Sequence, residues 1–398
     1  MSRLGVVVLA FWSTVALIVY AQFGYSLVMR GWAAMCSARR RPGPCPDEQL
    51  PHVSLIIPAH NEEVVIRAKI ENSLTIDYPR DRLQILVASD GSTDRTVAIC
   101  REFESRGITL LDFQENRGKA TVLNEAVRVS SGQVLCLCDA NVMFRPNALR
   151  LMVDWLQEPR VGSVTGDVQL QSYVSEFWSG ESVYYRIERQ LQMDETATGS
   201  TVIVDGGMFV IRRELFQPIP TDTVLDDYLS AMNVIRSGFQ IIYDPEAIAI
   251  ENGTPGSSAE YRRRIRVAAG GAQAIKRGQF PRMTQGGALF RWCSHKLARW
   301  LGPVALLVLA LTSVALRNQG WIFQAAILCQ VIVYGMASLG ALVPGLLKLR
   351  PVNVSFYFVL SHIAMGVGLL KGTFFGMSGR WKRTERVGVD GGLGQGRP

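Results

Sequence analysis

Carboxylates follow apolar runs in the middle of this 398-residue chain. Asp90 and Asp139 each come directly after such a run, and Asp226 and Asp227 form an adjacent pair further along. A carboxylate at a strand end can accept a hydrogen bond from a nucleotide base or ribose, or hold a divalent cation that bridges phosphates. An adjacent pair at a helix start can supply a general base for a hydroxyl group.

Each of these residues also has an ordinary structural explanation. An Asp-Gly turn at Asp90 needs no ligand, the pair at Asp226 suits a helix N-terminus, and Lys119 suits a solvated loop. The arginines at 262–266 could mark the cytoplasmic side of a membrane or neutralise a diphosphate leaving group. The choice therefore depends on the elements that position these side chains.

Three apolar runs, which begin at Val53, Leu83 and Gln133, are typical of buried strands in a parallel sheet. Ligands bind at the carboxyl ends of such strands, so we expect Asp90 and Asp139 to face one crevice. Further strands are expected at 161–170, 201–210, 239–243 and 247–250. Helices are expected at 62–78, 93–106, 121–130, 145–156, 173–193, 225–237 and 260–276.

Apolar stretches at both ends predict an integral membrane protein. Residues 4–29 carry no charge, are long enough to span a bilayer and lack a cleavage pattern, so we expect an anchor. Three more apolar stretches follow, at 301–316, 320–347 and 354–377. Basic residues beside these segments predict an external N-terminus and a cytoplasmic middle, in a bacterial cytoplasmic membrane. The basic residues at 380–386 favour an internal tail, so 354–377 is the stretch least expected to cross.

Composition excludes some classes of function. The net charge of +8 is concentrated near the spans, where basic groups meet anionic lipid or sugar-nucleotide phosphates. No basic stripe with interleaved aromatic residues occurs, so nucleic acid is not an expected partner. The seven cysteines lack paired zinc spacing. Cys136 and Cys138 alternate within an apolar run, which predicts buried packing.

The order of the motifs resembles the membrane-bound family-2 glycosyltransferases, which include the cellulose, chitin, hyaluronan and poly-N-acetylglucosamine synthases. The resemblance covers roughly residues 50–300 and the flanking spans. The motifs that carry it are Pro58-Ala-His-Asn-Glu62, Asp90-Gly-Ser-Thr-Asp94, Asn116-Arg-Gly-Lys119 with Asn124, Asp139-Ala-Asn141, Gly166-Asp167, Gly206-Gly207, Leu225-Asp-Asp227, Arg263-Arg-Ile-Arg-Val267 and Trp381-Lys-Arg-Thr384.

This resemblance implies an α/β fold, with a GT-A-type nucleotide-sugar-binding cytoplasmic domain flanked by transmembrane helices. The expected parts are a first span at 1–29, a linker at 30–50, the catalytic domain at 51–285, an interfacial helix at 286–300, a transmembrane region of two or three spans at 301–377 and a basic, then glycine-rich tail at 378–398.

The resemblance also implies an inverting glycosyltransferase with a UDP-sugar donor, expected to be UDP-N-acetylglucosamine or UDP-glucose, and Mg²⁺ or Mn²⁺ as cofactor. Asp227 would be the base, with Asp226 beside it. The metal would bind at Asp139 and Asn141. The donor-binding residues would be Pro58, Glu62, Asp90, Lys119, Asp139 and Asn141. The acceptor or diphosphate residues would be Asp167, Gly206, Gly207, Arg263, Arg266 and Trp381.

Two departures from the family pattern affect these expectations. Asn141 stands where the metal motif has a second aspartate, so the site loses one negative charge. Arg263 and Val267 stand where the family has glutamine and an acceptor-contacting tryptophan, while Arg266 keeps the arginine. The second departure favours single transfer over processive polymerisation.

Three functional hypotheses remain open at this point. The first is a polysaccharide synthase, with membrane lipid around it and a polysaccharide-export partner. The second is transfer of one sugar to a lipid or lipid-linked acceptor. The third is a catalytically silent membrane sensor of nucleotide sugars, which Asn141 alone supports and which the presence of Asp139 and Asp227 opposes.

Overall fold

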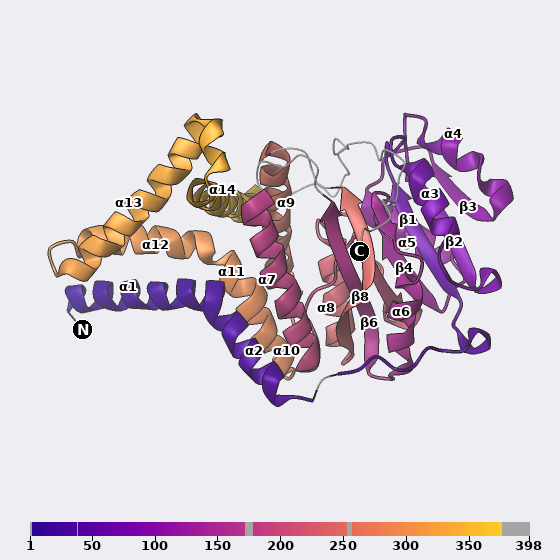
Figure 1. The fold of residues 1–398 in the computed structure, drawn as a ribbon, viewed down its shortest axis with the longest axis horizontal. Helices are drawn as coiled ribbons and strands as arrows, with labels where there is room; N and C mark the ends of the chain where they lie inside the picture. The colour runs from indigo at the N-terminus through magenta and orange to yellow at the C-terminus, as the bar shows by residue number, and fades with distance from the viewer. Residues whose placement is uncertain (1, 38, 172–177, 253–256, 376–398) are drawn as a thin grey trace. The chain divides into compact units, whose positions relative to one another are not determined.

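The computed structural model describes residues 2–37, 39–171, 178–252 and 257–375 (Figure 1). The described chain forms two compact units. One is helical and takes its residues from 1–38, 174–202 and 256–377. The other contains the sheet and takes its residues from 39–173 and 203–255. The predicted boundaries of the catalytic domain remain a prediction, because compact packing alone does not define a ligand-binding domain.

The sheet unit is built on eight strands in the order β3-β2-β1-β4-β7-β6-β8-β5 (Figure 1). β1 pairs in parallel with β2 and β4, whereas β7 pairs antiparallel with β4 and β6. The predicted α/β class is confirmed, but the sheet is mixed. The strands are β1 Val53–Ala59, β2 Leu83–Asp90, β3 Ile108–Phe113, β4 Val134–Cys138, β5 Val142–Phe144, β6 Val161–Gln171, β7 Met208–Arg212 and β8 Gln240–Asn252.

Helices pack on both faces of this sheet. Apolar side chains of α3, α4 and α6 share one buried cluster with Leu55, Ile85 and Cys136 of the central strands. α5 packs against β1 and β2, and α8 packs against β6 and β8. Cys136 and Cys138 are buried, as their alternation predicted. The helices are α3 Ile66–Leu74, α4 Thr96–Arg101, α5 Lys119–Val129, α6 Ala148–Asp154 and α8 Asp226–Arg236.

Several strand predictions were wrong in extent. β7 begins only at Met208, because the Gly206-Gly207 turn interrupts the run predicted from residue 201. The two strands predicted at 239–243 and 247–250 form one strand, β8, whose pairing with β6 is irregular around Pro245. Proline lacks the N–H that a regular ladder uses, so an irregularity there is expected. β3 and β5 are additional strands.

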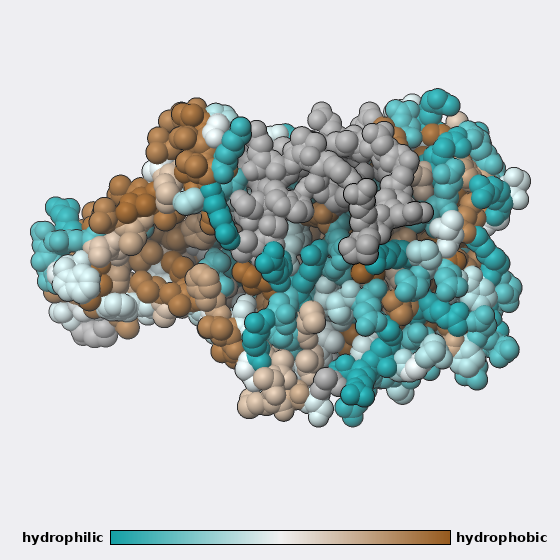
Figure 2. Space-filling view, in the orientation of Figure 1, coloured by the Kyte–Doolittle hydropathy of each residue, from teal (hydrophilic) through white to brown (hydrophobic). Residues whose placement is uncertain are grey.

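The helical unit contains the apolar segments. Its helices are α1 Arg3–Val19, α2 Tyr25–Met35, α7 Trp178–Ala197, α9 Ser257–Lys276, α10 Gly286–Trp292, α11 Ala298–Trp300, α12 Gly302–Ala315, α13 Trp321–Leu342 and α14 Arg350–Leu370. Three π-helical segments continue these helices in the described residues: η1 Tyr20–Gly24 after α1, η7 Cys293–Leu297 between α10 and α11, and η9 Lys371–Phe375 after α14. Figure 2 shows apolar side chains gathered over α12 and α13.

Three described helices are long and apolar enough to cross a membrane: Arg3–Met35, Trp321–Leu342 and Arg350–Phe375. A fourth arises if the bent pair Gly286–Trp300 and Gly302–Ala315 counts as one span. That pair bends by 58° near Leu301, which is where the sequence divides an interfacial helix from a span.

Candidate active site

The turn after β2 anchors one side of the site. Asp90 is the last residue of β2 and is fully buried. Its Oδ1 accepts from the Arg117 N–H at 2.7 Å and its Oδ2 from the Gly118 N–H at 2.9 Å. Gly91 has a φ of +62°, and a Cβ there would lie 2.5 Å from the backbone nitrogen of Asn116. The Asp90-Gly91 turn therefore holds the loop that precedes α5.

Lys119 connects this loop to two other parts of the site. Its Nζ lies 2.9 Å from Asp139 Oδ1, after β4, and 3.2 Å from Asp226 Oδ2, at the start of α8. Burial opposes the charged ammonium, but Asp139 and Asp226 outweigh it and raise the pKa of Lys119. The lysine thus stays charged between carboxylates from two elements, and the loop held by Asp90 leads to the Asp139 side chain. That Asp90 and Asp139 face one crevice remains a prediction.

Asp226 and Asp227 occupy the first two positions of α8. Asp227 Oδ1 accepts from the Tyr228 N–H at 2.7 Å, so a backbone N–H in the first turn of α8 orients this carboxylate. Gly206 leaves room for the Asp227 side chain, because a Cβ at Gly206 would lie 3.2 Å from Asp227 Cβ. The glycine pair at 206–207 is therefore part of the same site.

Asp205 was not among the site residues predicted from the sequence. Its position directly before the Gly206-Gly207 motif was the signal that could have identified it. Its Oδ1 accepts from the Gly207 N–H at 2.8 Å. Asp205 as a whole residue is exposed to solvent. Its carboxyl group, however, lies among protein atoms and next to other acids. This loss of water, followed by the negative charge of Glu251, Asp227 and Asp139, raises the pKa of Asp205 to about 7.

Asn141 and Glu251 form a second contact that the sequence did not reveal. Asn141 Nδ2 donates to Glu251 Oε1 at 2.9 Å. The buried Asn141 Oδ1 has no hydrogen-bond partner in the described part of the chain. That carbonyl oxygen and the Asp139 carboxylate are oxygen ligands of the kind that Mg²⁺ and Mn²⁺ bind. Within residues 2–37, 39–171, 178–252 and 257–375, no three His, Cys, Asp or Glu side chains converge on one point.

The remaining predicted donor-side residues lie in the first strand and the turn after it. Pro58 is buried in β1, beyond the last pairing of that strand with β4 and opposite Ala88 of β2. Glu62 is buried, and its backbone N–H donates to Thr96 Oγ1 at 2.8 Å. Their contacts with a donor remain predictions.

The predicted acceptor and diphosphate residues divide between the two units. Asp167 accepts from the Tyr243 hydroxyl at 3.0 Å in the sheet unit. Arg263 and Arg266 belong to α9 of the helical unit, where Arg263 pairs with Glu260 at 2.9 Å. Trp381 lies outside the described residues. The roles of these four side chains toward acceptor or diphosphate therefore stay predictions.

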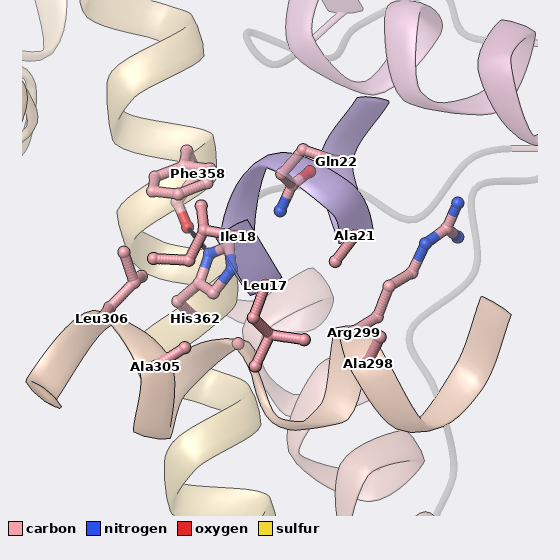
Figure 3. Close-up of a pocket in the computed structure, with 11 residues that line it drawn as sticks. Leu17, Ile18, Ala21, Gln22, Ala298, Arg299, Ala305, Leu306, Phe358 and His362 are labelled. Carbon is pink, nitrogen blue, oxygen red and sulfur yellow. Dashed lines mark hydrogen bonds between the residues drawn. The ribbon is translucent and has the colours of Figure 1, made fainter. Parts of the chain in front are cut away.

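A separate pocket lies within the helical unit, between α1, η1, α11, α12 and α14 (Figure 3). Apolar side chains dominate its lining. Arg299 reaches this pocket, but its Nη1 lies 2.5 Å from Glu188 Oε2. His362 Nδ1 bonds to the Phe358 carbonyl oxygen at 2.8 Å. None of the predicted site residues lines this pocket.

Comparison with known proteins finds a family match within the middle of the chain. Residues 54–219 match the family described as Glycosyl transferase family 2. The chain carries a glycosyl transferase family 2 domain. The resemblance inferred from the motifs is thus confirmed, as is the enzyme class at the level of the family. All the residues from Asp90 to Asp205 described above lie inside the matched range.

Relatives of this glycosyltransferase domain include a Probable glycosyltransferase YdaM from Bacillus subtilis (strain 168), 28% identical over 57% of this chain and 57% of that protein. A Poly-beta-1,6-N-acetyl-D-glucosamine synthase of Staphylococcus epidermidis is 22% identical over 59% of this chain and 58% of that protein. The chain spans less than two thirds of the length of these curated relatives.

A solved structure shares the fold over most of the chain. It is the Mannosyltransferase PcManGT from Pyrobaculum calidifontis, determined in complex with GDP-Man and Mn²⁺. It is 23% identical, with a TM-score of 0.69, and the match covers 92% of this chain and 99% of that one. The GT-A-type fold predicted from the motifs is therefore confirmed.

Proposed function

We propose that this chain is an inverting glycosyltransferase that moves a sugar from a nucleoside-diphosphate sugar to an acceptor hydroxyl at the cytoplasmic face of a membrane. The observation that carries the proposal is the position of Lys119. Its backbone follows the loop held by Asp90, and its ammonium bridges Asp139 and Asp226. The expected nucleotide side, diphosphate side and base of the reaction are thereby connected within one crevice.

Asp227 acts as the general base in this proposal. Its carboxylate takes the proton from the acceptor hydroxyl while that oxygen attacks the anomeric carbon of the donor. The bond from the anomeric carbon to the diphosphate oxygen breaks at the same time, so the configuration inverts. Asp226 pairs with Lys119 at 3.2 Å, and Asp227 follows it at the start of α8.

Positive charge is needed where the nucleoside diphosphate leaves. A divalent cation held by Asp139 and Asn141 would neutralise the diphosphate. The Lys119 ammonium adds a second positive charge beside it. The Mn²⁺ in the complex of the Pyrobaculum mannosyltransferase supports a cation of this kind, and we propose Mg²⁺ or Mn²⁺ for this chain.

We also propose the identities of the donor and the acceptor. UDP-N-acetylglucosamine and UDP-glucose remain the expected donors, and the name of the Staphylococcus synthase supports the first. GDP-mannose joins them because PcManGT was determined with it. The acceptor would be a growing saccharide or a membrane lipid, with a polysaccharide-export partner in the first case. Val267, in place of the acceptor-contacting tryptophan, favours the lipid.

The test is nucleoside-diphosphate release by the full chain in lipid nanodiscs. UDP-N-acetylglucosamine, UDP-glucose, UDP-galactose and GDP-mannose would each be supplied with Mg²⁺ or Mn²⁺. We expect release from one donor, and we expect Asp227→Asn to lower that rate by roughly 10²–10⁴-fold, because a general base contributes about this much. The length of the product then separates polymerisation from single transfer.

Asp81→Asn is the matched control, because that carboxylate is 80% exposed and lies on a surface turn of the same unit. It should keep the native rate. Equal rates for Asp227→Asn and the native chain would exclude Asp227 as the base. Donor binding without release or transfer under all these conditions would support the silent-sensor hypothesis instead.

A further inference from the structure

The cation site of this domain is short of one acidic group. Asn141 is neutral, so the segment Asp139-Ala-Asn141 brings one negative charge where the family motif brings two. The structure places another carboxylate beside it. Glu251 Oε1 accepts from Asn141 Nδ2 at 2.9 Å. This partner lies more than a hundred residues further along the chain, so the motif itself gives no sign of it.

Strand pairing fixes the position of Glu251. β5 and β8 pair antiparallel, and Glu251 lies opposite Val142, the residue after Asn141. β8 also pairs with β6, where Glu251 lies opposite Leu170. The backbone on both sides of Glu251 is therefore held in the sheet, and the contact with Asn141 does not depend on a loose surface side chain.

The contact also sets the direction of the Asn141 amide. A carboxylate can only accept, so Glu251 selects the NH₂ side of the amide. The carbonyl oxygen, Oδ1, is left on the other side. Asn141 is 4% exposed, and its Oδ1 has no hydrogen-bond partner among the described residues. A buried acceptor without a partner is costly unless something binds it, and a cation is a suitable ligand for a carbonyl oxygen.

The surrounding charge also favours a cation. Asp205 interacts electrostatically with Glu251, Asp227 and Asp139. Lys119 is the cation that pairs with Asp139 there in the described structure. A group of carboxylates near a single ammonium attracts a divalent cation. The same carboxylates repel a diphosphate that has no bound cation. Glu251 thus adds charge on the side of the crevice where Asn141 lacks it.

We propose that Glu251 is a positioning residue for the divalent cation, which holds the Asn141 carbonyl oxygen toward the ion and replaces the negative charge that Asn141 does not carry. This inference rests on the proposed function and assigns a partner to its cation site. Groups that orient a metal ligand typically change metal affinity by about 10–100-fold when removed.

The experiment measures Mn²⁺ binding to the full chain in lipid nanodiscs, from the electron paramagnetic resonance signal of the free ion. We expect Glu251→Gln to weaken Mn²⁺ binding by about 10–100-fold. Glutamine can still accept from Asn141 Nδ2, so the change removes mainly charge. Glu246→Gln is the matched control on the same strand, because its carboxylate pairs with Arg41 at 2.7 Å, and it should bind Mn²⁺ as the native chain does.

A rescue variant separates charge from general damage. Asn141→Asp in the Glu251→Gln background returns the missing charge to the motif and should recover most of the lost affinity. Native-like Mn²⁺ binding by Glu251→Gln, no rescue by the double variant, or no Mn²⁺ binding by the native chain would each overturn the inference.

The unfolding midpoint of each variant shows whether the chain is folded during the measurement. Because the readout needs no sugar transfer, the two proposals can fail separately. Transfer with Glu251-independent Mn²⁺ binding removes only this inference. Glu251-dependent Mn²⁺ binding without transfer from any donor removes only the proposed function.

Discussion

Among single residues, Asp205 has the environment that departs most from that of an ordinary surface aspartate. Its pKa is about 7, whereas the ordinary value is 3.8. Between pH 3.8 and about pH 7, folding of the chain is therefore accompanied by uptake of a proton at Asp205. The folded state is therefore stabilised at low pH, and this contribution is lost as the pH rises through about 7. The pKa is raised first by the loss of water around the Asp205 carboxyl group and then by the negative charge of Glu251, Asp227 and Asp139.

Asp205→Asn should therefore raise the unfolding midpoint, and the gain should be larger at about pH 8.5 than at about pH 5.5. Asparagine carries no charge at either pH, so it avoids the repulsion that the native aspartate meets above its pKa. The measurement is thermal unfolding with a chelator present, so that no cation neutralises the site. A gain that is the same at both pH values would contradict the raised pKa.

Two glycines with positive φ provide a second test at this scale. Gly91 and Gly107 have φ values of +62° and +90°. A Cβ at Gly107 would have open space, whereas a Cβ at Gly91 would meet the backbone of Glu115 and Asn116 at 2.5 Å. Gly107→Ala should cost about 1 kcal/mol, the usual penalty for a left-handed alanine.

Gly91→Ala should cost at least about 2 kcal/mol more than Gly107→Ala, because the loop before α5 must also move. It should weaken nucleotide binding as well, since that loop leads to Lys119. Denaturant unfolding and binding of UDP or GDP measure the two effects. Equal costs for the two variants would mean that the Asp90-Gly91 turn does not constrain this loop.

At the scale of the elements, a buried ionic network connects three helical segments within the helical unit. His295 of η7 is fully buried, with Nδ1 at 2.8 Å from Glu195 Oε1 and Nε2 at 2.7 Å from Glu188 Oε1. The Tyr25 hydroxyl donates to Glu195 at 2.6 Å. Burial raises the pKa of Glu188, but Arg299 and His295 outweigh it and hold it well below its usual range. The network thus joins α2, α7 and the segment around η7.

Two of the π-helical segments, η1 and η7, lie where this network forms. Tyr20 begins η1, and its hydroxyl lies 2.7 Å from Ser294 Oγ in η7. A π-bulge turns the following side chains relative to a regular helix, and such bulges are often found at functional positions. In this unit the bulges occur where polar side chains from two predominantly apolar helices meet. The hydropathy of the sequence does not reveal this meeting point.

His295→Leu should destabilise the helical unit by about 3–5 kcal/mol, because two buried carboxylates lose a charged partner. Arg30→Gln is the control within the same unit. Its ion pair with Asp194 spans 3.8 Å, and Arg30 is 61% exposed. The control should change stability by at most about 1 kcal/mol. Unfolding of the full chain in detergent measures both, and similar small losses would show that the buried network is not needed for stability.

At the scale of the whole molecule, the membrane topology follows from charge and helix packing. α1 packs along α12 in the helical unit (Figure 1), and Leu316 at the end of α12 packs against Phe11 of α1. The bend near Leu301 separates α12 from the segment predicted to be interfacial. α14 passes the length and composition test, but it packs along α9, a basic helix. α14 is therefore still the expected non-crossing segment.

We predict that the N-terminus and the loop at 316–320 face outside, and that the loop at 343–349 faces the cytoplasm with the tail. Lys348 and Arg350 then lie on the cytoplasmic side, as basic residues near spans usually do. Topology reporters fused after Gln319, Lys348 and the last residue measure this directly. An external tail would mean that α14 crosses the membrane, and an internal loop at 316–320 would mean that α12 does not.

The sequence by itself was sufficient for the α/β class, the GT-A-type fold and the apolar segments at both ends. These features depend on local patterns: apolar runs that end in carboxylates, motifs that keep their order, and long uncharged stretches. A local pattern also explains why the strand limits around Gly206 and Pro245 were wrong. An apolar run shows where a strand is favoured, but turn geometry and partner register decide where pairing ends.

Only the tertiary structure could decide which distant residues meet. Glu251 reaches Asn141 because β8 pairs with β5, and Lys119 at the start of α5 bridges Asp139, after β4, and Asp226, at the start of α8. His295 meets Glu188 and Glu195 across about a hundred residues of chain. The free energy of these contacts depends on burial and on partner distance, and both are set by packing rather than by neighbouring residues in the sequence.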